Sequence, residues 1–178
     1  MRYAKLLALF LFIYGCATAR PSEVSSGPGP IAKLYAGYGG VEGGGPFCDT
    51  NSPTGISEIA IEGTGCLGSC PIYTLILRSD GTATYMGRAN TRFIGTRHGK
   101  IDPRTVEDVA KLAVDIGFFD MDDFYSCQVT DSPTVYVSIV RNETRKTITH
   151  YAPDLSGPPR LGLLEVTITR LGELITWQ

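Results

Sequence analysis

The sequence contains few of the residues on which catalysis and nucleic-acid binding most often depend. It has two histidines, one tryptophan and three methionines among 178 residues, and its 16 basic and 18 acidic side chains give a formal net charge of −2. No run of like charges occurs along the chain. Because proteins that bind nucleic acid neutralise phosphates with a clustered basic surface, we expect no nucleic-acid partner.

Motifs that would define an active site are also missing. Neither His98 nor His150 has a serine or cysteine nucleophile placed by a recognisable motif. The acidic stretch Asp120-Met121-Asp122-Asp123 lacks the ligand spacing and turn glycine of a calcium loop, and Asp131-Ser132-Pro133 is typical of a turn. The sequence therefore predicts no catalytic residue and no cofactor. An enzyme would need a pocket that gathers Asp131, His98 or His150 with a nucleophile.

No apolar run near the start of the chain is long enough to cross a membrane as a helix, which takes about twenty residues. The run Leu6–Tyr14 has nine residues and follows the positive charges of Arg2 and Lys5. A run of this length behind positive charges is typical of a signal peptide. We therefore predict that residues 1–15 are a signal peptide and that the protein is exported.

The end of this segment indicates a lipid anchor. Ile13-Tyr14-Gly15-Cys16 resembles the lipobox of bacterial lipoproteins, with an aliphatic residue three positions before the cysteine and a small residue directly before it. Tyr14 departs from the pattern, which usually has a small residue there. The resemblance implies that Cys16 is the lipidated N-terminus and that the membrane is a partner through this anchor, because several acyl chains hold a protein stably on a bilayer.

The resemblance also bears on location. It places the protein in the cell envelope, and Ala17-Thr18 lacks the aspartate associated with inner-membrane retention. In an organism with two membranes it therefore favours the outer membrane or a site facing the periplasm. Two alternatives remain open: an ordinary signal peptide cut after Ala17 or Ala19, and an uncleaved apolar N-terminus.

Residues 16–55 differ in composition from the rest of the chain. Glycine and proline dominate them, in stretches such as Gly27-Pro28-Gly29-Pro30 and Gly43-Gly44-Gly45-Pro46. A segment with so little apolar surface cannot offset the entropy lost on ordering its backbone, so we expect a flexible tether. Ile31-Ala32-Lys33-Leu34-Tyr35 is the one patch within it able to dock on the domain.

Residues 56–178 are predicted to form a single α+β domain. Alternating or clustered β-formers predict strands around 59–61 and at 72–78, 83–87, 134–140 and 147–151, with 91–96 extending or adding to the third. Asp102-Pro103 is a good helix start and Gly117 a stop, and a second helix is predicted after Pro158-Pro159. We expect an antiparallel sheet of about five strands with two helices packed on one face.

A family resemblance rests on the cysteine motif. Cys66-Leu67-Gly68-Ser69-Cys70-Pro71-Ile72-Tyr73 resembles the pattern Cys-x-Gly-x-Cys-Pro-x-Tyr of the exported bacterial domain of unknown function 6438. Later elements of the family pattern follow in order: Asp80-Gly81, Tyr85, Gly87, Gly117-Phe118 and Thr130-Asp131-Ser132-Pro133. The resemblance covers about Ser57 to Trp177. It bears on fold and location, and it brings no activity, ligand or catalytic residue.

If the chain is exported and Cys16 is lipidated, four of the five cysteines remain for other roles: Cys48, Cys66, Cys70 and Cys127. An oxidising compartment favours disulfides. We predict a structural Cys66–Cys70 disulfide, because Gly68 lets the short loop fold back, and this leaves Cys48 and Cys127 to pair by elimination.

Two other functions compete for the same cysteines. Cys66 and Cys70 have a spacing also found in copper-handling proteins, with His98 or His150 as a third ligand, and they could also act as a thiol-redox pair. In the copper-handling fold, however, the second cysteine begins a helix, whereas Cys70-Pro71 precedes a predicted strand. No helix start or cation is evident that would stabilise a thiolate.

The leading interpretation is a non-catalytic module of the cell envelope. The predicted tether, the small disulfide-stapled domain and the missing catalytic set all favour it. Its expected partner is another envelope protein, a peptide or a glycan. The alternative is a metal (copper-type) or thiol-redox accessory protein that uses Cys66 and Cys70.

Overall fold

The computed structural model describes residues 52–178. The predicted signal peptide, Cys16, Cys48 and nearly all of the predicted tether lie outside these residues. Within them the elements follow in this order: β1 (Ile56–Gly63), β2 (Ile72–Arg78), β3 (Thr82–Ala89), β4 (Gly95–Lys100), α2 (Pro103–Asp115), the 3-10 helix η1 (Phe118–Asp120), β5 (Phe124–Tyr125), β6 (Thr134–Arg141), β7 (Thr144–Tyr151), α3 (Pro159–Leu171) and β8 (Thr176–Trp177).

The strands form one eight-stranded sheet in the order β5-β7-β6-β1-β2-β3-β4-β8. Neighbouring strands are antiparallel except β5 and β7, which are parallel, so the sheet is mixed. The predicted antiparallel sheet of about five strands is therefore wrong. The strands that sequence reasoning missed are short or polar: β5 and β8 have two residues each, and β4 reads GTRHGK. Neither kind produces the apolar alternation that reveals a strand.

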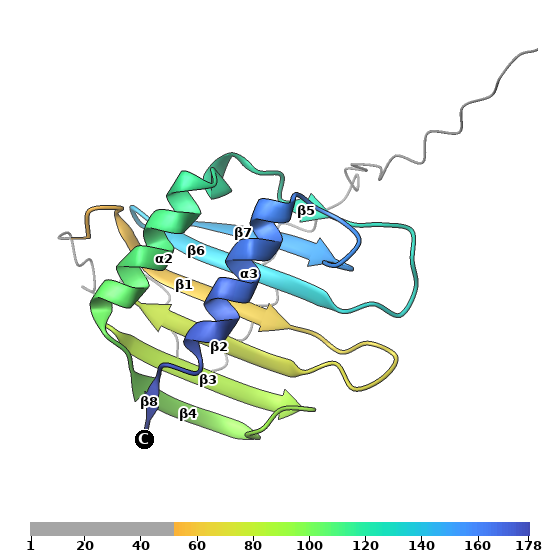
Figure 1. The fold of residues 1–178 in the computed structure, drawn as a ribbon, viewed down its shortest axis with the longest axis horizontal. Coiled ribbons are helices and arrows are strands. Elements are labelled where there is room, and N and C mark those ends of the chain that lie inside the picture. The colour runs from red at the N-terminus through yellow and green to blue at the C-terminus, as the bar shows by residue number, and fades with distance from the viewer. Residues whose placement is uncertain (1–51) are drawn as a thin grey trace, which may run out of the picture.

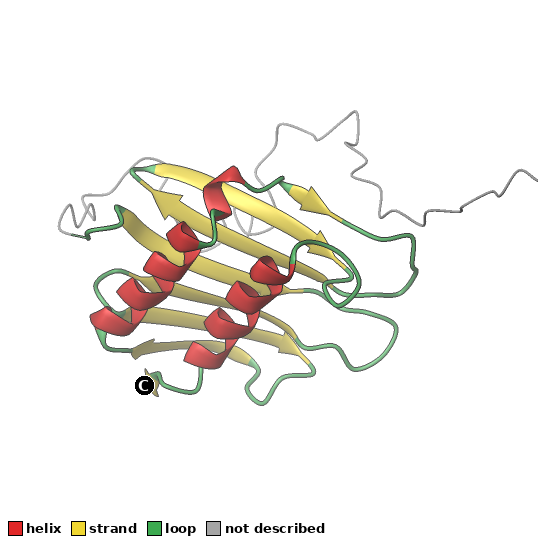
Figure 2. Ribbon diagram, turned by 45° about the horizontal axis from the view of Figure 1, so that its top comes forward, coloured by secondary structure: helices red, strands yellow, loops and turns green. Residues whose placement is uncertain are grey.

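Both helices lie on one face of the sheet, as Figures 1 and 2 show. Helix α2 begins where the Asp102 side chain accepts a hydrogen bond from the Arg104 backbone N–H, with Pro103 in the first turn. Helix α3 begins at Pro159 without a side-chain cap. None of the helices among the described residues is long and apolar enough to cross a membrane.

The two faces of the sheet differ because successive strand residues point to opposite sides. On the central strand β1, Ile59 and Ile61 join the main core beneath the helices, whereas Ala60 belongs to a small separate cluster. Glu58 and Glu62 share the side of Ala60. We call the side covered by α2 and α3 the helix face and the opposite side the open face.

Packing of α3 on the helix face generates a stability prediction. Leu164 is fully buried, whereas its neighbour Leu163 is 56% exposed. Leu164→Ala removes core contacts and leaves a cavity, so we expect it to lower the free energy of unfolding by about 2–5 kcal/mol. Leu163→Ala is the matched control and should change it by about 0.5 kcal/mol or less. Urea unfolding of both variants measures the difference, and equal losses would contradict the described packing.

Candidate functional site

A groove opens between α3 and the ends of three neighbouring strands, with a volume of about 370 Å³. This volume lies within the range of small-ligand and side-chain pockets. Strands β1, β2 and β6, the β7–α3 loop and one side of α3 contribute its walls: Ile61, Tyr73, Val135, Pro153, Asp154, Gly162, Glu165, Val166, Thr169 and Arg170. We call this pocket the α3 groove.

Three loops meet beside the α3 groove, at the right-hand edge of the sheet in Figure 1. The β1–β2 loop carries the Cys66–Cys70 disulfide, whose Cα atoms lie 5.6 Å apart. The second loop connects β5 and β6, and its Asp131 carbonyl accepts a hydrogen bond from the Leu67 N–H of the β1–β2 loop at 3.3 Å. The third loop connects β7 and α3, and its Ala152 N–H donates to the Pro133 carbonyl of the second loop at 3.0 Å. The loops that border the groove are therefore joined to one another through their backbones.

Apolar side chains surround the α3 groove as well as lining it. Val166 is 51% exposed on the groove side of α3. Leu163, one helical turn earlier, and Leu155, next to the lining residue Asp154, are also exposed. Helix residues three apart share a face, so Leu163 extends the apolar wall formed by Val166. Exposed apolar surface around a concavity is typical of an interaction site.

Glu165, one of the polar residues that line the groove, forms a buried ion pair with His150. His150 of β7 is 1% exposed; its Nδ1 lies 2.7 Å from Glu165 Oε1, and its Nε2 lies 2.7 Å from the Ser156 carbonyl oxygen. A carbonyl only accepts, so Nε2 carries a hydrogen and one further proton is shared between Nδ1 and the carboxylate. Burial alone lowers the pKa of His150, but Glu165, the Ser156 carbonyl and Asp154 together raise it above its usual value.

The groove also contains a pair of hydroxyl groups, from Tyr73 and Thr169. Thr169 Oγ1 donates to the Glu165 carbonyl at 2.8 Å, so the Tyr73 hydroxyl, 3.0 Å from Thr169 Oγ1, acts as the donor to it. Burial raises the pKa of Tyr73 above its usual value, and the Tyr73 ring stacks on Tyr85 at 5.9 Å. These contacts fix the tyrosine as a rigid wall of the groove.

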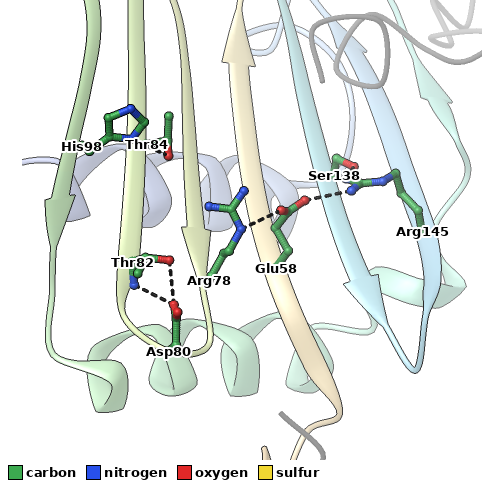
Figure 3. A network of polar contacts seen from close by, with 8 residues as sticks. All are labelled: Glu58, Arg78, Asp80, Thr82, Thr84, His98, Ser138 and Arg145. Carbon is green, nitrogen blue, oxygen red and sulfur yellow. Dashed lines mark hydrogen bonds and ion pairs between the residues drawn. The ribbon is translucent and has the colours of Figure 1, made fainter. Parts of the chain in front are cut away.

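The open face carries a second polar arrangement, shown in Figure 3. Arg78 and Arg145 approach the Glu58 carboxylate from opposite sides, with N–O distances of 3.5 and 2.8 Å. Arg145 also donates to Ser138 Oγ at 2.8 Å. Both oxygens of Glu58 thus have a cationic partner, and the cluster joins β2, β1, β6 and β7 across the sheet.

Glu62 lies four residues further along the same strand, and only one of its two carboxylate oxygens has a hydrogen-bond partner. Arg88 lies 2.7 Å from Glu62 Oε1, but Oε2 is buried without a hydrogen-bond partner. Thr74 stands opposite Glu62 on β2, and its Oγ1 is also buried and unpartnered. Burial and then the charge of Glu62 raise the pKa of Tyr136, the neighbour of Glu62 on β6.

The candidate residues predicted from sequence do not form one site. Cys66 and Cys70 are joined in the β1–β2 loop, as predicted. His98 lies in β4, on the open face, with Nδ1 3.3 Å from Thr84 Oγ1. His150 is buried on the helix face, so the sheet separates the two histidines. The described residues contain no group of three His, Cys, Asp or Glu side chains arranged to hold a metal.

The other predicted residues have structural surroundings. Cys127 Sγ lies 2.7 Å from the Leu155 carbonyl oxygen, and its predicted partner Cys48 is outside the described residues, so that pairing stays a prediction. Asp123 forms an ion pair with Lys146 at 2.8 Å. Asp131 has a positive φ of 64° and accepts a hydrogen bond through its backbone carbonyl.

Sequence reasoning missed the residues that give both surfaces their chemistry. Glu165 occurs in an amphipathic helix, where a single acidic residue usually faces solvent. Glu58 and Glu62 alternate with apolar residues on β1 and would be expected on a hydrated face. No sequence signal set these two glutamates apart, because β2 and β6 contain more apolar residues than β1 and the burial of β1 on both sides is a property of the folded sheet.

One family matches most of the described chain. The sequence profile described as Domain of unknown function (DUF6438) matches residues 57–172. The match runs from β1 to the end of α3 and includes the disulfide loop, the α3 groove and the His150–Glu165 pair. No protein of curated function matches the chain.

The His150–Glu165 pair predicts a pH dependence of stability. A raised pKa in the folded state means that the folded protein binds the extra proton, so its stabilisation is complete below about 6.5 and is lost as pH rises through the folded pKa. We expect the free energy of unfolding to fall with rising pH above that value, and Glu165→Gln to remove this slope. Urea unfolding over a pH series measures it. His98→Asn is the control, and a slope retained in Glu165→Gln would contradict the assignment.

Proposed function

The chain belongs to the DUF6438 family, and we propose that it is an exported lipoprotein, anchored through Cys16, whose domain binds an apolar segment of another envelope protein or peptide in the α3 groove. The domain is a recognition module in this proposal and has no catalytic role. Membrane attachment through the lipid would keep the module at the surface on which its partner occurs.

The observation that carries the binding role is the α3 groove itself. Its floor consists of Ile61, Tyr73 and Val135, which the sheet and the core hold in place, and its outer wall is the exposed Val166. An apolar concavity lined with a small number of polar groups is the usual form of a binding pocket. Asp154, Glu165 and Arg170 supply those polar groups.

The chemistry of the groove favours a peptide over a glycan. Its apolar lining includes the aliphatic residues Ile61, Val135 and Val166, and its one aromatic ring, Tyr73, is already stacked on Tyr85. Sugars usually bind where an aromatic face is open for stacking together with several hydrogen-bonding groups. An aliphatic wall instead suits the leucine or valine side chains of a peptide, which gain free energy in proportion to the apolar area they bury.

The disulfide supports the proposed location. The Cys66–Cys70 bond is the form expected of a pair of nearby cysteines outside the cytosol, in agreement with the signal-like segment 1–15. The metal or thiol-redox alternative lacks a favouring observation. The two sulfurs are bonded to each other, and β2 rather than a helix follows Cys70, so no helix N-terminus would stabilise a thiolate there.

Lipidation of Cys16 is directly testable. In cells fed an alkyne analogue of palmitate, we expect the wild-type chain to be labelled and to sediment with membranes. Cys16→Ser should lose both properties, because Cys16 is the cysteine that stands directly behind the signal-like apolar run Leu6–Tyr14. Cys48→Ser is the matched control and should keep the label. An unlabelled wild-type chain, or a Cys16→Ser variant that is still labelled, would overturn the anchor.

Gly162 provides a test of the α3 groove. It lines the groove, and a Cβ built on it meets no atom within 4 Å. The side chain of Gly162→Leu would therefore start from open space at its Cβ and occupy part of the groove, and the substitution should stabilise the helix by a few tenths to about 1 kcal/mol. The probe is a displayed random peptide library selected on the full wild-type chain. We expect selected peptides to bind Gly162→Leu at least about tenfold more weakly, a loss of about 1.4 kcal/mol.

Gly162→Ala is the control for this experiment, since it adds a single methyl group and should leave most of the affinity. Binding is measured by fluorescence anisotropy, and thermal unfolding confirms that each variant is folded. Selected peptides that bind Gly162→Leu as tightly as wild type would overturn the groove as the site. A library that yields no peptide binder would count against peptide recognition itself.

A further inference from the structure

A row of side chains crosses the open face beside the buried carboxylate of Glu62. Tyr136, Glu62, Thr74 and Met86 stand next to one another on β6, β1, β2 and β3 in the strand register. Glu62 is 2% exposed, Thr74 is fully buried and Met86 is 7% exposed. These side chains are buried as deeply as the core, although neither α2 nor α3 lies on this face.

The centre of the row has unmet hydrogen-bonding capacity. Oε2 of Glu62 and Oγ1 of Thr74 are both buried without a partner, and they belong to directly opposed residues. Arg88 satisfies only Oε1 of the glutamate. A buried carboxylate oxygen without a donor is costly, so the site calls for a cationic group with several N–H donors. A lysine ammonium has three.

The two ends of the row require apolar groups with a defined spacing. Neighbouring strands lie about 4.8 Å apart, so Met86 and Tyr136 each lie about 7 Å from the midpoint between Glu62 and Thr74. In an extended peptide, residues two positions apart are separated by about 6.8 Å and point to the same side. A peptide that crosses the strands would thus place a lysine over Glu62 and Thr74, with the residues two before and two after it over the ends.

We propose that this row binds residues 31–35 of the same chain, with Lys33 between Glu62 and Thr74. Ile31 and Tyr35 are the residues two before and two after Lys33, and both are apolar enough to pack on Met86 and Tyr136. These residues lie outside the described part of the chain. Among residues 17–51, Lys33 is the only lysine, and it stands in the one apolar patch.

The length of the intervening chain permits this contact. The described chain enters at Ser52, whose hydroxyl donates to Glu107 of α2 at 2.7 Å, and continues into the start of β1. Glu62 lies about 20 Å from Ile56 along the strand. The 17 residues from Tyr35 to Ser52 can span up to about 55–60 Å. A covalently linked segment is also present at a high effective concentration, which favours it over a free peptide.

The proposal is tested by tryptic cleavage at Lys33 in the full chain. Glu42→Lys is introduced as a reference site in the glycine-rich stretch, nine residues away. We expect cleavage after Lys33 to be at least about tenfold slower than cleavage after the reference lysine, and Glu62→Gln to remove this protection, because the charge-assisted hydrogen bond is lost. Digestion is followed by mass spectrometry under native conditions.

Glu58→Gln is the matched control, since Glu58 is on the same face of β1 but already has two arginine partners. It should leave the protection at Lys33 unchanged. Equal cleavage at Lys33 and the reference site in the otherwise wild-type chain would overturn the proposal. So would protection that increases with protein concentration, because that would place the segment of a second copy on the row. Protection retained in Glu62→Gln would exclude the assigned contact.

A charge-reversal experiment distinguishes loss of the Lys33–Glu62 contact from unfolding of the Glu62→Gln variant. Lys33→Glu should speed chymotryptic cleavage at Tyr35 by about tenfold, the expected effect of replacing an attractive charge pair with a repulsive one. Adding Glu62→Lys should restore protection. Failure of the double variant to restore it, with the domain still folded by circular dichroism, would overturn the pairing. These outcomes do not bear on the α3 groove, whose ligand and variants are different.

Discussion

The structure depends on one constraint: a sheet whose central strand must bury side chains on both sides while helices cover only one of them. Ile59 and Ile61 are sealed beneath the helices by apolar packing, which contributes most of the stabilising free energy of such a domain. Strand alternation then forces Glu58 and Glu62 onto the open face. The helix face is closed by hydrophobic contacts, and the open face is left to polar ones.

Three carboxylates are buried in the part of the chain that the structure describes, and their charges are compensated to different degrees. Glu58 has two arginine partners, and Glu165 shares a proton with His150, so each has its charge compensated. Glu62 has one oxygen paired and one without a donor. Because a buried ionised group without full compensation destabilises the fold, the difference between Glu58 and Glu62 on one strand marks where the domain itself supplies no donor.

Sequence reasoning found the elements whose signal is local. The strand expected at residues 72–78 coincides with β2, and the helix expected after Asp102-Pro103 begins as its capping residues indicate. The Cys66–Cys70 pairing also followed from a four-residue separation. The sheet was misjudged because β5 and β8 are defined by pairing with distant strands, and their own sequences carry no period. Pairing of this kind is a property of the tertiary structure.

The candidate sites were less predictable than the fold for the same reason. His150 and Glu165 are 15 residues apart on different elements, and only packing of α3 on the sheet brings them within 2.7 Å. Glu62 and Thr74 face each other because the β1–β2 hairpin has one particular register. Neither contact could be predicted from the types of the residues involved, because the partners are far apart in the sequence. The disulfide could be predicted, because both of its cysteines lie within one short segment of the β1–β2 loop.

The α3 groove and the row on the open face are the two sides of one stretch of sheet. Ile61, Tyr73 and Val135 line the groove, and the residues that follow them directly, Glu62, Thr74 and Tyr136, form most of the row. Since a shift of one residue in strand register exchanges the two faces, both surfaces depend on the same register of these three strands. The disulfide loop and the joined loops beside it hold the ends of these three strands, so they fix the register that both surfaces require.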